Sequence, residues 1–219
     1  MVTPPPTQQN NESSLSVNRL NSSDFIQARD PFALFAQWFQ EAQDSEINDP
    51  EAMALASIDA DGAPDVRMVL CKGIDERGFV FYSNEHSEKG RQLAENPKAA
   101  LLFHWKTLRR QVRIRGAVSP ASAAESDAYF ASRSRDSRIG AWASQQSRSL
   151  PDRSVLEREF ARYAAQFGEG DIPRPPHWRG FRLSPTAIEF WKDGVSRLHD
   201  RLLFERKAGG DWTRRWLYP

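Results

Sequence analysis

Cysteine and histidine are scarce in this chain. Its 219 residues include one cysteine, Cys71, and four histidines, which excludes an internal disulfide framework and a zinc site made of several thiolates. No apolar stretch reaches the roughly 18 residues that a membrane-spanning helix needs. The N-terminus also lacks the basic region followed by an apolar one that marks a secretory signal. We therefore expect a cytoplasmic protein with no metal and no membrane partner.

Charge of one sign is not in excess either. Lys and Arg number 30 and Asp and Glu number 29, so the formal net charge is +1 and gives no general attraction to nucleic acid. The motifs G-x-G-x-x-G, G-x-x-x-x-G-K-[ST], G-x-S-x-G and H-E-x-x-H are all missing. An enzyme with this sequence would bind phosphate through dispersed side chains and would need an organic cofactor for difficult chemistry.

The order of apolar and polar residues predicts one folded domain behind an arm. Residues 1–24 are rich in Pro, Gln, Asn and Ser, which predicts a disordered arm, and residues 25–219 form the domain. Capping signals and helical spacing predict helices from Pro31, from Ser87, over 119–132 and over 151–167. Strands are expected over 53–58, 66–72, 78–83, 99–105, 111–118, 178–183, 188–191, 202–206 and 212–217. Hairpin-like links without regular strand–helix alternation predict a mainly antiparallel barrel or sandwich with helices outside.

Two polar clusters lie on the second and third of these strands. Arg67 and Lys72 enclose an apolar strand and face opposite sides of it, so they suit two anionic groups or are simply charged strand ends in solvent. Residues 82–90 combine a strand end, a polar loop and a helix start. This segment is either a phosphate site at a helix N-terminus or an ordinary capped helix.

Three more clusters follow along the chain. Residues 106–115 are basic at five of ten positions, which fits a strand that follows RNA phosphates or, better with the balanced net charge, an exposed charged hairpin. Tyr129, Arg133 and Ser137 are spaced by four, so a continuous helix would present them on one face as a phosphate clamp. Arg197, His199 and Arg201 alternate, so an extended segment would place all three on one face, where they could contact a ligand.

Four stretches, taken in order, resemble the pyridoxamine 5′-phosphate oxidase family: RMVLCK at 67–72, SRDSRIGAW at 134–142, IEFW at 188–191 and RLHDR at 197–201. The resemblance covers residues 30–219. It implies a mainly β FMN-binding split barrel with three to five surrounding helices, and a homodimer that binds FMN between its subunits. The implied activity is oxidation of pyridoxamine and pyridoxine 5′-phosphate to pyridoxal 5′-phosphate. Hydride would pass from C4′ to flavin N5, and oxygen would reoxidise the flavin to give hydrogen peroxide.

The resemblance also assigns roles to residues, with some FMN contacts coming from the second subunit. The positions implied for FMN are Arg67, Met68, Val69, Leu70, Lys72, Tyr82, Ser83, Ser87, Glu88, Lys89, Gln111, Gln146, Ser147, Trp191 and Arg201. The substrate phosphate would be held by Lys72, Tyr129, Arg133 and Ser137. Arg197 and His199 would lie at the pyridine ring of the substrate as the catalytic residues.

Three positions depart from the family pattern. Glu88 stands where an arginine is common, so we expect its carboxylate to turn outward and the affinity for FMN to be lower. Cys71 replaces an aliphatic residue, and Trp216 stands where the C-terminal pattern has arginine. Two other functions stay open: a flavin or deazaflavin reductase with another substrate on the same fold, and a nonenzymatic carrier of flavin or pyridoxal phosphate or an RNA-binding module.

Overall fold

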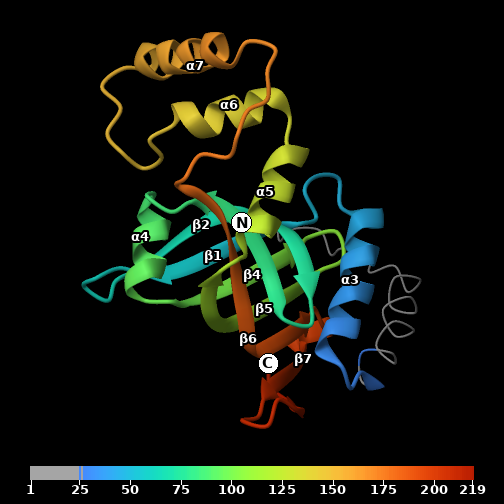
Figure 1. The fold of residues 1–219 in the computed structure, drawn as a ribbon. Helices are drawn as coiled ribbons and strands as arrows, with labels where there is room; N and C mark the ends of the chain where they lie inside the picture. Colours follow the sequence, from blue (N-terminus) through green and yellow to red (C-terminus); the bar gives the residue numbers. More distant parts are fainter. Residues whose placement is uncertain (1–24, 26) are drawn as a thin grey trace, which may run out of the picture.

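The computed structural model describes residues 25 and 27–219. Its strand pairings give a closed antiparallel barrel of six strands, which forms the centre of the molecule (Figure 1). The predicted arm, residues 1–24, lies outside the described residues. Pairing of β3 with β6 closes the barrel, and β7 and β8 extend the sheet from β6. In sheet order the strands are β3 (Gly78–Asn84), β2 (Pro64–Asp75), β1 (Ala52–Ile58), β4 (Lys98–Trp105), β5 (Arg110–Pro120), β6 (Trp178–Lys192), β7 (Asp200–Arg206) and β8 (Trp212–Trp216). The predicted mainly β split-barrel fold is confirmed.

The strand β6 connects the barrel to the outer hairpin. Residues 178–183 pair with β3 and residues 187–192 pair with β7, so the strand leaves the barrel as it joins the hairpin. The sequence predicted two separate strands here, over 178–183 and 188–191. The structure joins them through a register shift in which Pro185 lies opposite Gly116. A Cβ on Gly116 would lie 2.0 Å from the Ser184 carbonyl oxygen, so this bulge requires glycine.

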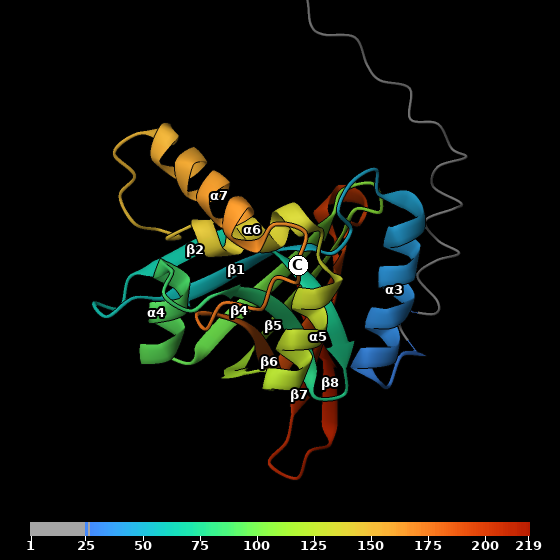
Figure 2. The same cartoon turned by 45° about the horizontal axis from the view of Figure 1, so that its top comes forward.

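An aromatic core fills the barrel, and α3 (Pro31–Ser45) covers one side of it (Figure 2). Asp30 caps the helix as predicted, its carboxylate accepting from Phe32 N at 2.8 Å. Phe35 is fully buried, with its ring centroid 5.0 Å from those of both Phe79 and Phe103. Cys71 belongs to the same core, and burial raises the pKa of its thiol to about 12, so it acts as a small apolar side chain.

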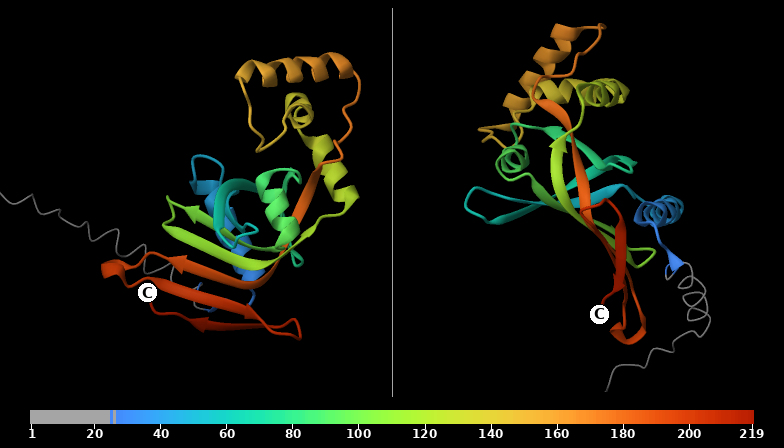
Figure 3. Two further views of the ribbon diagram at one scale, coloured as in Figure 1. Left: turned by 90° about the vertical axis from the view of Figure 1, so that its left-hand side faces the viewer. Right: turned by 60° about the horizontal axis from the view of Figure 1, so that its bottom comes forward.

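The described residues form four further helices: α4 (Glu88–Glu95), α5 (Ala123–Ser132), α6 (Arg135–Ala143) and α7 (Arg153–Phe167). The helices α5 to α7 gather at one end, and the β7–β8 hairpin extends from the other (Figure 3). Within the described residues, no helix combines the length and the apolar composition that crossing a membrane requires.

Two helix predictions are wrong in detail. The predicted start of α5 at Ser119 is too early, because β5 continues to Pro120 and Ser122 is the N-cap, in a capping box with Glu125. The helix α6 was not predicted as a separate helix. The Ser134 side chain caps α6, with Ser137 N as its donor at 3.4 Å.

Candidate active site

A buried lysine marks the start of α4. Lys89 is 9% exposed, and its Nζ lies 3.2 Å from Gln146 Oε1 and 3.4 Å from Ser87 Oγ. Ser83 Oγ also donates to Gln146 Oε1, at 3.3 Å. Burial lowers the pKa of Lys89, and the cation of nearby Arg67 lowers it further. A buried cation and two hydroxyls beside a helix N-terminus suit a phosphate group.

Arg67 lies on the inner side of β2 and is held firmly. Its Nη1 donates to Leu55 O at 3.1 Å, and its Nη2 donates to Gln92 Oε1 at 3.1 Å and pairs with Asp65. Lys72 lies on the opposite, exposed face of the strand and pairs with Glu51 at 2.7 Å. The predicted opposite orientation of the two cations is therefore confirmed. The partners Gln92 and Glu51 could not be identified from the sequence, because Gln92 is 25 positions from Arg67 and Glu51 is 21 positions from Lys72.

Glu88 turns away from this cation cluster. Its side chain is 51% exposed and pairs with Arg91 one turn along α4. The outward orientation expected from the sequence is present. Arg91 also donates to His86 O at 2.7 Å, so its guanidinium is engaged outside the cluster of Lys89 and Arg67.

Stacked aromatic rings lead from Lys89 to α5. The ring centroid of Tyr82 lies 4.0 Å from that of Tyr129 and 5.3 Å from that of Trp178. The Arg133 guanidinium lies over Trp178, 5.2 Å from the ring centroid. Its Nη1 is buried without a hydrogen-bond partner among the described residues, and burial lowers the pKa of Arg133. A donor left in this state is suited to an incoming anion.

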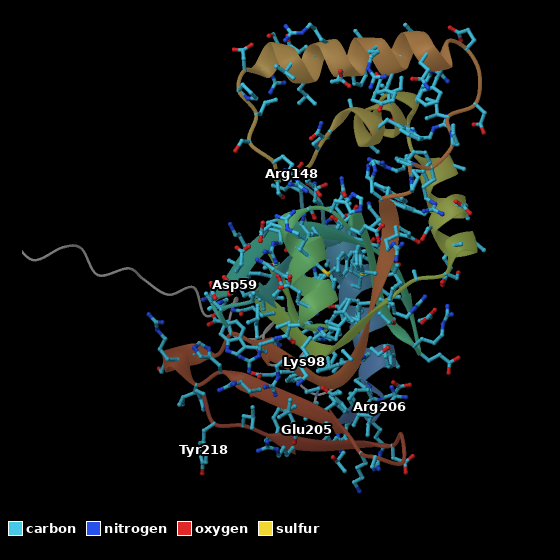
Figure 4. All side chains as sticks on the ribbon, turned by 60° about the vertical axis from the view of Figure 1, so that its left-hand side comes forward. Asp59, Lys98, Arg148, Glu205, Arg206 and Tyr218 are labelled. Carbon is cyan, nitrogen blue, oxygen red and sulfur yellow. The ribbon has the colours of Figure 1, made fainter. Side chains whose placement is uncertain are left out.

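These residues enclose one cavity of about 250 Å³. Its lining joins predicted FMN and substrate positions with one residue that sequence reasoning missed, Trp178. The lining residues are Met68, Val69, Leu70, Lys72, Tyr82, Ser83, Lys89, Tyr129, Arg133, Gln146 and Trp178. The loop after α6 that supplies Gln146 also carries Arg148, at the α4 end of the barrel, whereas Glu205 and Arg206 lie at the other end (Figure 4).

Ser137 does not share a helical face with Tyr129 and Arg133, which corrects the prediction of one continuous helix. The helix α5 ends at Ser132, and Arg133 has extended backbone angles of φ −75° and ψ 152°. Ser137 belongs to the first turn of α6, where its Oγ accepts from Ser134 Oγ at 2.8 Å. The chain reverses here because Ser134 caps a new helix.

A second group of predicted FMN positions lies on the outer face of β5, β6 and β7. Gln111, Trp191 and Arg201 line a separate cavity of about 270 Å³. Glu189, which is 6% exposed, accepts from Arg201 Nε at 2.8 Å and pairs with Arg113. None of these three residues lines the cavity that contains Lys89 and Arg133, so within one chain the two groups of predicted FMN positions are separate. Ser147 lies next to Gln146 and is exposed, and Arg215 pairs with Glu205 instead of lining either cavity.

The segment around Arg197 is a turn, so the prediction of one extended face with His199 and Arg201 is wrong. Residues Val195–Arg197 form a 3-10 turn in which Ser196 and Arg197 have φ values of 56° and 66°. His199 packs on Trp191 with ring centroids 4.6 Å apart, and its Nδ1 accepts from Gly194 N at 3.2 Å. Left-handed angles at residues other than glycine are strained and concentrate at functional sites.

The basic segment at 106–115 is largely neutralised. Arg109 pairs with Asp193, Arg113 pairs with Glu189, and Arg110 is buried against Glu41 and Trp38. The interpretation as an exposed charged hairpin is therefore wrong for Arg110. These pairs also leave few cations free to follow RNA phosphates.

Comparison with known proteins gives consistent matches. Residues 39–167 match the family described as pyridoxamine 5′-phosphate oxidase, and residues 178–219 match a pyridoxine 5′-phosphate oxidase C-terminal dimerisation region. Curated proteins named pyridoxine/pyridoxamine 5′-phosphate oxidase include one from Maricaulis maris, 62% identical over 91% of this chain and 90% of that protein. One from Caulobacter vibrioides is 60% identical over 89% of this chain and 87% of that protein.

A solved structure agrees. The crystal structure of PhzG from Burkholderia lata, in complex with tetrahydrophenazine-1-carboxylic acid, has a TM-score of 0.83 and 35% sequence identity, covering 88% of this chain and 94% of that one. The matched family covers more than half of this chain, and the curated relatives cover nearly all of it. This chain therefore belongs to the pyridoxamine 5′-phosphate oxidase family and is an oxidoreductase.

Proposed function

We propose that this chain oxidises pyridoxamine and pyridoxine 5′-phosphate to pyridoxal 5′-phosphate with FMN as its cofactor, as a cytoplasmic homodimer in which residues 25–219 act as one oxidase domain. When bound, FMN supplies the hydride acceptor, N5, for the hydrogen on substrate C4′, and oxygen then removes the electrons as hydrogen peroxide. The names of the curated relatives support the substrates.

The observation that carries the proposal is the cavity shared by Lys89 and Arg133. Burial disfavours the charged form of each side chain, and the pKa of each is lowered. A bound anion would stabilise the charged form of both side chains and so offset the effect of burial. Lys89 and Arg133 contact different residues of the cavity, so they suit two phosphate groups, one on FMN and one on the substrate.

The site residues form two groups, each of which would bind one phosphate. Lys89, Ser87 and Ser83 would hold the FMN phosphate at the start of α4, with Arg67 adding charge from β2. Arg133, Tyr129 and Lys72 would hold the substrate phosphate, and Ser137 would join them from the start of α6. Fixing both molecules through their phosphates orients the two rings toward each other, which is the main contribution a protein makes to a cofactor's reaction.

The second subunit would complete each site. Gln111, Trp191 and Arg201 lie in a different cavity from Lys89, so we assign them to the flavin that the partner holds. The dimerisation match covers Trp191, Arg197, His199 and Arg201. In this arrangement the strained turn would bring Arg197 to the substrate ring, where its guanidinium polarises the C4′ substituent, and His199 would orient that substituent.

The test is an anaerobic titration of the FMN-reconstituted protein with pyridoxine 5′-phosphate, followed by admission of air. We expect the visible absorbance of the oxidised flavin to bleach as the substrate reduces it and to recover in air. A bound flavin that never bleaches would leave the fold and cofactor in place and reject this substrate. The same titration with a tetrahydrophenazine carboxylic acid, the ligand in the PhzG structure, tests the alternative of another substrate on this fold.

A further inference from the structure

A network of four charged side chains lies at the foot of α5, outside both cavities. Arg182, on β6, is 8% exposed. Its Nη1 donates to Asp75 Oδ1 at 2.7 Å and its Nη2 to Glu125 Oε1 at 2.7 Å. Arg77 contacts the same two carboxylates from the exposed side, with its Nη2 2.6 Å from Asp75 Oδ2 and 3.1 Å from Glu125 Oε1. Arg182 therefore links the end of β2 to the first turn of α5.

Glu125 also holds the backbone of its own helix. Its Oε2 accepts from Ser122 N at 3.0 Å and from Ser122 Oγ at 2.8 Å, which completes the capping box. These hydrogen bonds and the Arg182 cation lower the pKa of Glu125 to about 2, so the carboxylate stays ionised near neutral pH. One side chain thus connects the start of α5 to the barrel.

The substrate-phosphate residues follow Glu125 at helical spacing. Tyr129 lies one turn further along α5, and Arg133 lies at its C-terminal cap. At 1.5 Å per residue, Arg133 is about 12 Å from Glu125, so a tilt of about 5° at the foot of the helix moves the guanidinium by about 1 Å. A displacement of that size is enough to weaken a positioned contact severely.

We propose that Arg182 and Glu125 are positioning residues that set the tilt of α5 and thereby place Tyr129 and Arg133 for the phosphate of the substrate. The inference rests on the proposed function, because it takes this phosphate as the ligand of Arg133. Tyr82 supports the same geometry, since its hydroxyl lies 3.4 Å from Glu125 O while its ring stacks on Tyr129. Arg182 reaches Asp75 and Glu125 with two separate nitrogens of its planar guanidinium, so lysine at position 182 would keep the charge and lose this two-nitrogen geometry.

The experiment compares Arg182→Met and Arg182→Lys with wild type in the FMN-loaded enzyme. The measurements are KM and kcat for pyridoxine 5′-phosphate, and the ratio of the Kd values for pyridoxal and pyridoxal 5′-phosphate. We expect Arg182→Met to raise KM about 10-fold, to change kcat less than about twofold and to lower the ratio about 10-fold. Arg182→Lys should fall between Arg182→Met and wild type. Arg162→Met, which breaks an exposed pair with Glu159 on α7, is the matched control and should match wild type.

Three outcomes decide between the hypotheses. An Arg182→Met protein that folds and keeps the wild-type KM and Kd ratio would overturn the positioning role. If Arg182→Met does not fold, Glu125→Gln replaces it as the test variant. Its amide keeps an acceptor for Ser122 and removes the charge facing Arg182. An unchanged Kd ratio in Glu125→Gln would again overturn the positioning role. A ratio that is also unchanged in Arg133→Gln would instead reject the assignment of the substrate phosphate, which belongs to the proposed function.

Discussion

Lys89 and Gln146 are 57 positions apart in the chain, and their side chains meet with 3.2 Å between Nζ and Oε1. The same amide oxygen accepts from Ser83 Oγ at 3.3 Å. The loop after α6 is thus attached to the start of α4 through a neutral group. Because an amide supplies dipoles and no counter-charge, the Lys89 cation remains available to an anionic ligand.

Replacement of Lys89 by methionine should separate cofactor binding from stability. We expect FMN affinity to fall about 10- to 100-fold, because a charge-assisted hydrogen bond to the phosphate is lost. The FMN-free variant should melt at a higher temperature than wild type near neutral pH, because burial disfavours the Lys89 cation. Fluorescence titration with FMN and thermal melting of the cofactor-free protein measure the two effects.

The higher stability of the FMN-free Lys89→Met variant should depend on pH. The pKa of Lys89 is lowered in the folded protein, so the unfolded chain binds the extra proton and the wild type becomes more stable as pH rises toward about 10.5. The advantage of Lys89→Met should therefore shrink with rising pH. Lys98→Met, at an exposed position of β4, is the control. Equal FMN affinity for Lys89→Met and wild type would remove Lys89 from the phosphate site.

Glu88 should limit the affinity for FMN. Its carboxylate lies in the first turn of α4, on the same helix N-terminus as the expected phosphate. Although the side chain points outward, Glu88→Gln removes a like-charge repulsion of about 0.5–1 kcal/mol between the carboxylate and that phosphate, the scale of interactions between exposed charges. We expect the Kd for FMN to fall about two- to fivefold, as measured by fluorescence titration at low salt. The control is Glu95→Gln at the far end of the same helix. Weaker binding of FMN to Glu88→Gln would show that the pair with Arg91 supports the site.

Acid should remove the contribution of Glu125 to stability. Its pKa is lowered from 4.5 to about 2 in the folded protein, so the stabilisation is complete above about pH 4.5 and is lost as pH falls toward 2. The difference in Tm between wild type and Glu125→Gln should be largest above about pH 5 and should approach zero near pH 2. Thermal melts from about pH 7 downward measure it. A difference that stays constant over this range would mean that the charge of Glu125 does not contribute.

Arg197 should act on the chemical step more than on binding. In stopped-flow experiments without oxygen, Arg197→Met should slow flavin reduction by pyridoxine 5′-phosphate at least about tenfold, because the guanidinium no longer polarises the C4′ substituent. The Kd of the substrate should change less than about threefold, since its phosphate is held elsewhere. Leu198→Met, at an exposed neighbour, should behave as wild type. Equal reduction rates for Arg197→Met and wild type would remove this residue from the mechanism.

The elements that the sequence predicted well are those with strong local signals. Asp30 and Pro31 indicate the start of α3, and the structure places it there. The interval from 134 to 143 shows the opposite case. The spacing of Tyr129, Arg133 and Ser137 suggested one continuous helix, yet Ser137 belongs to a separate helix, α6. Trp142 of α6 packs on Tyr163 of α7 with ring centroids 5.6 Å apart and donates to Pro173 O at 2.8 Å. Tertiary packing decided the helix, because the local preferences in that segment were weak.

The candidate site also combines features that local sequence patterns predict with contacts that only the tertiary structure forms. Local periodicity was enough to place Arg67 and Lys72 on opposite faces of one strand and Ser87 at a helix start, because side-chain direction alternates along any strand and caps act within a few residues. Only the tertiary structure brought Lys89 to Gln146 and Arg133 to Trp178, and only it bent the chain at Ser134 and Ser196. These contacts depend on barrel closure between β3 and β6, a pairing of distant segments that no local pattern encodes.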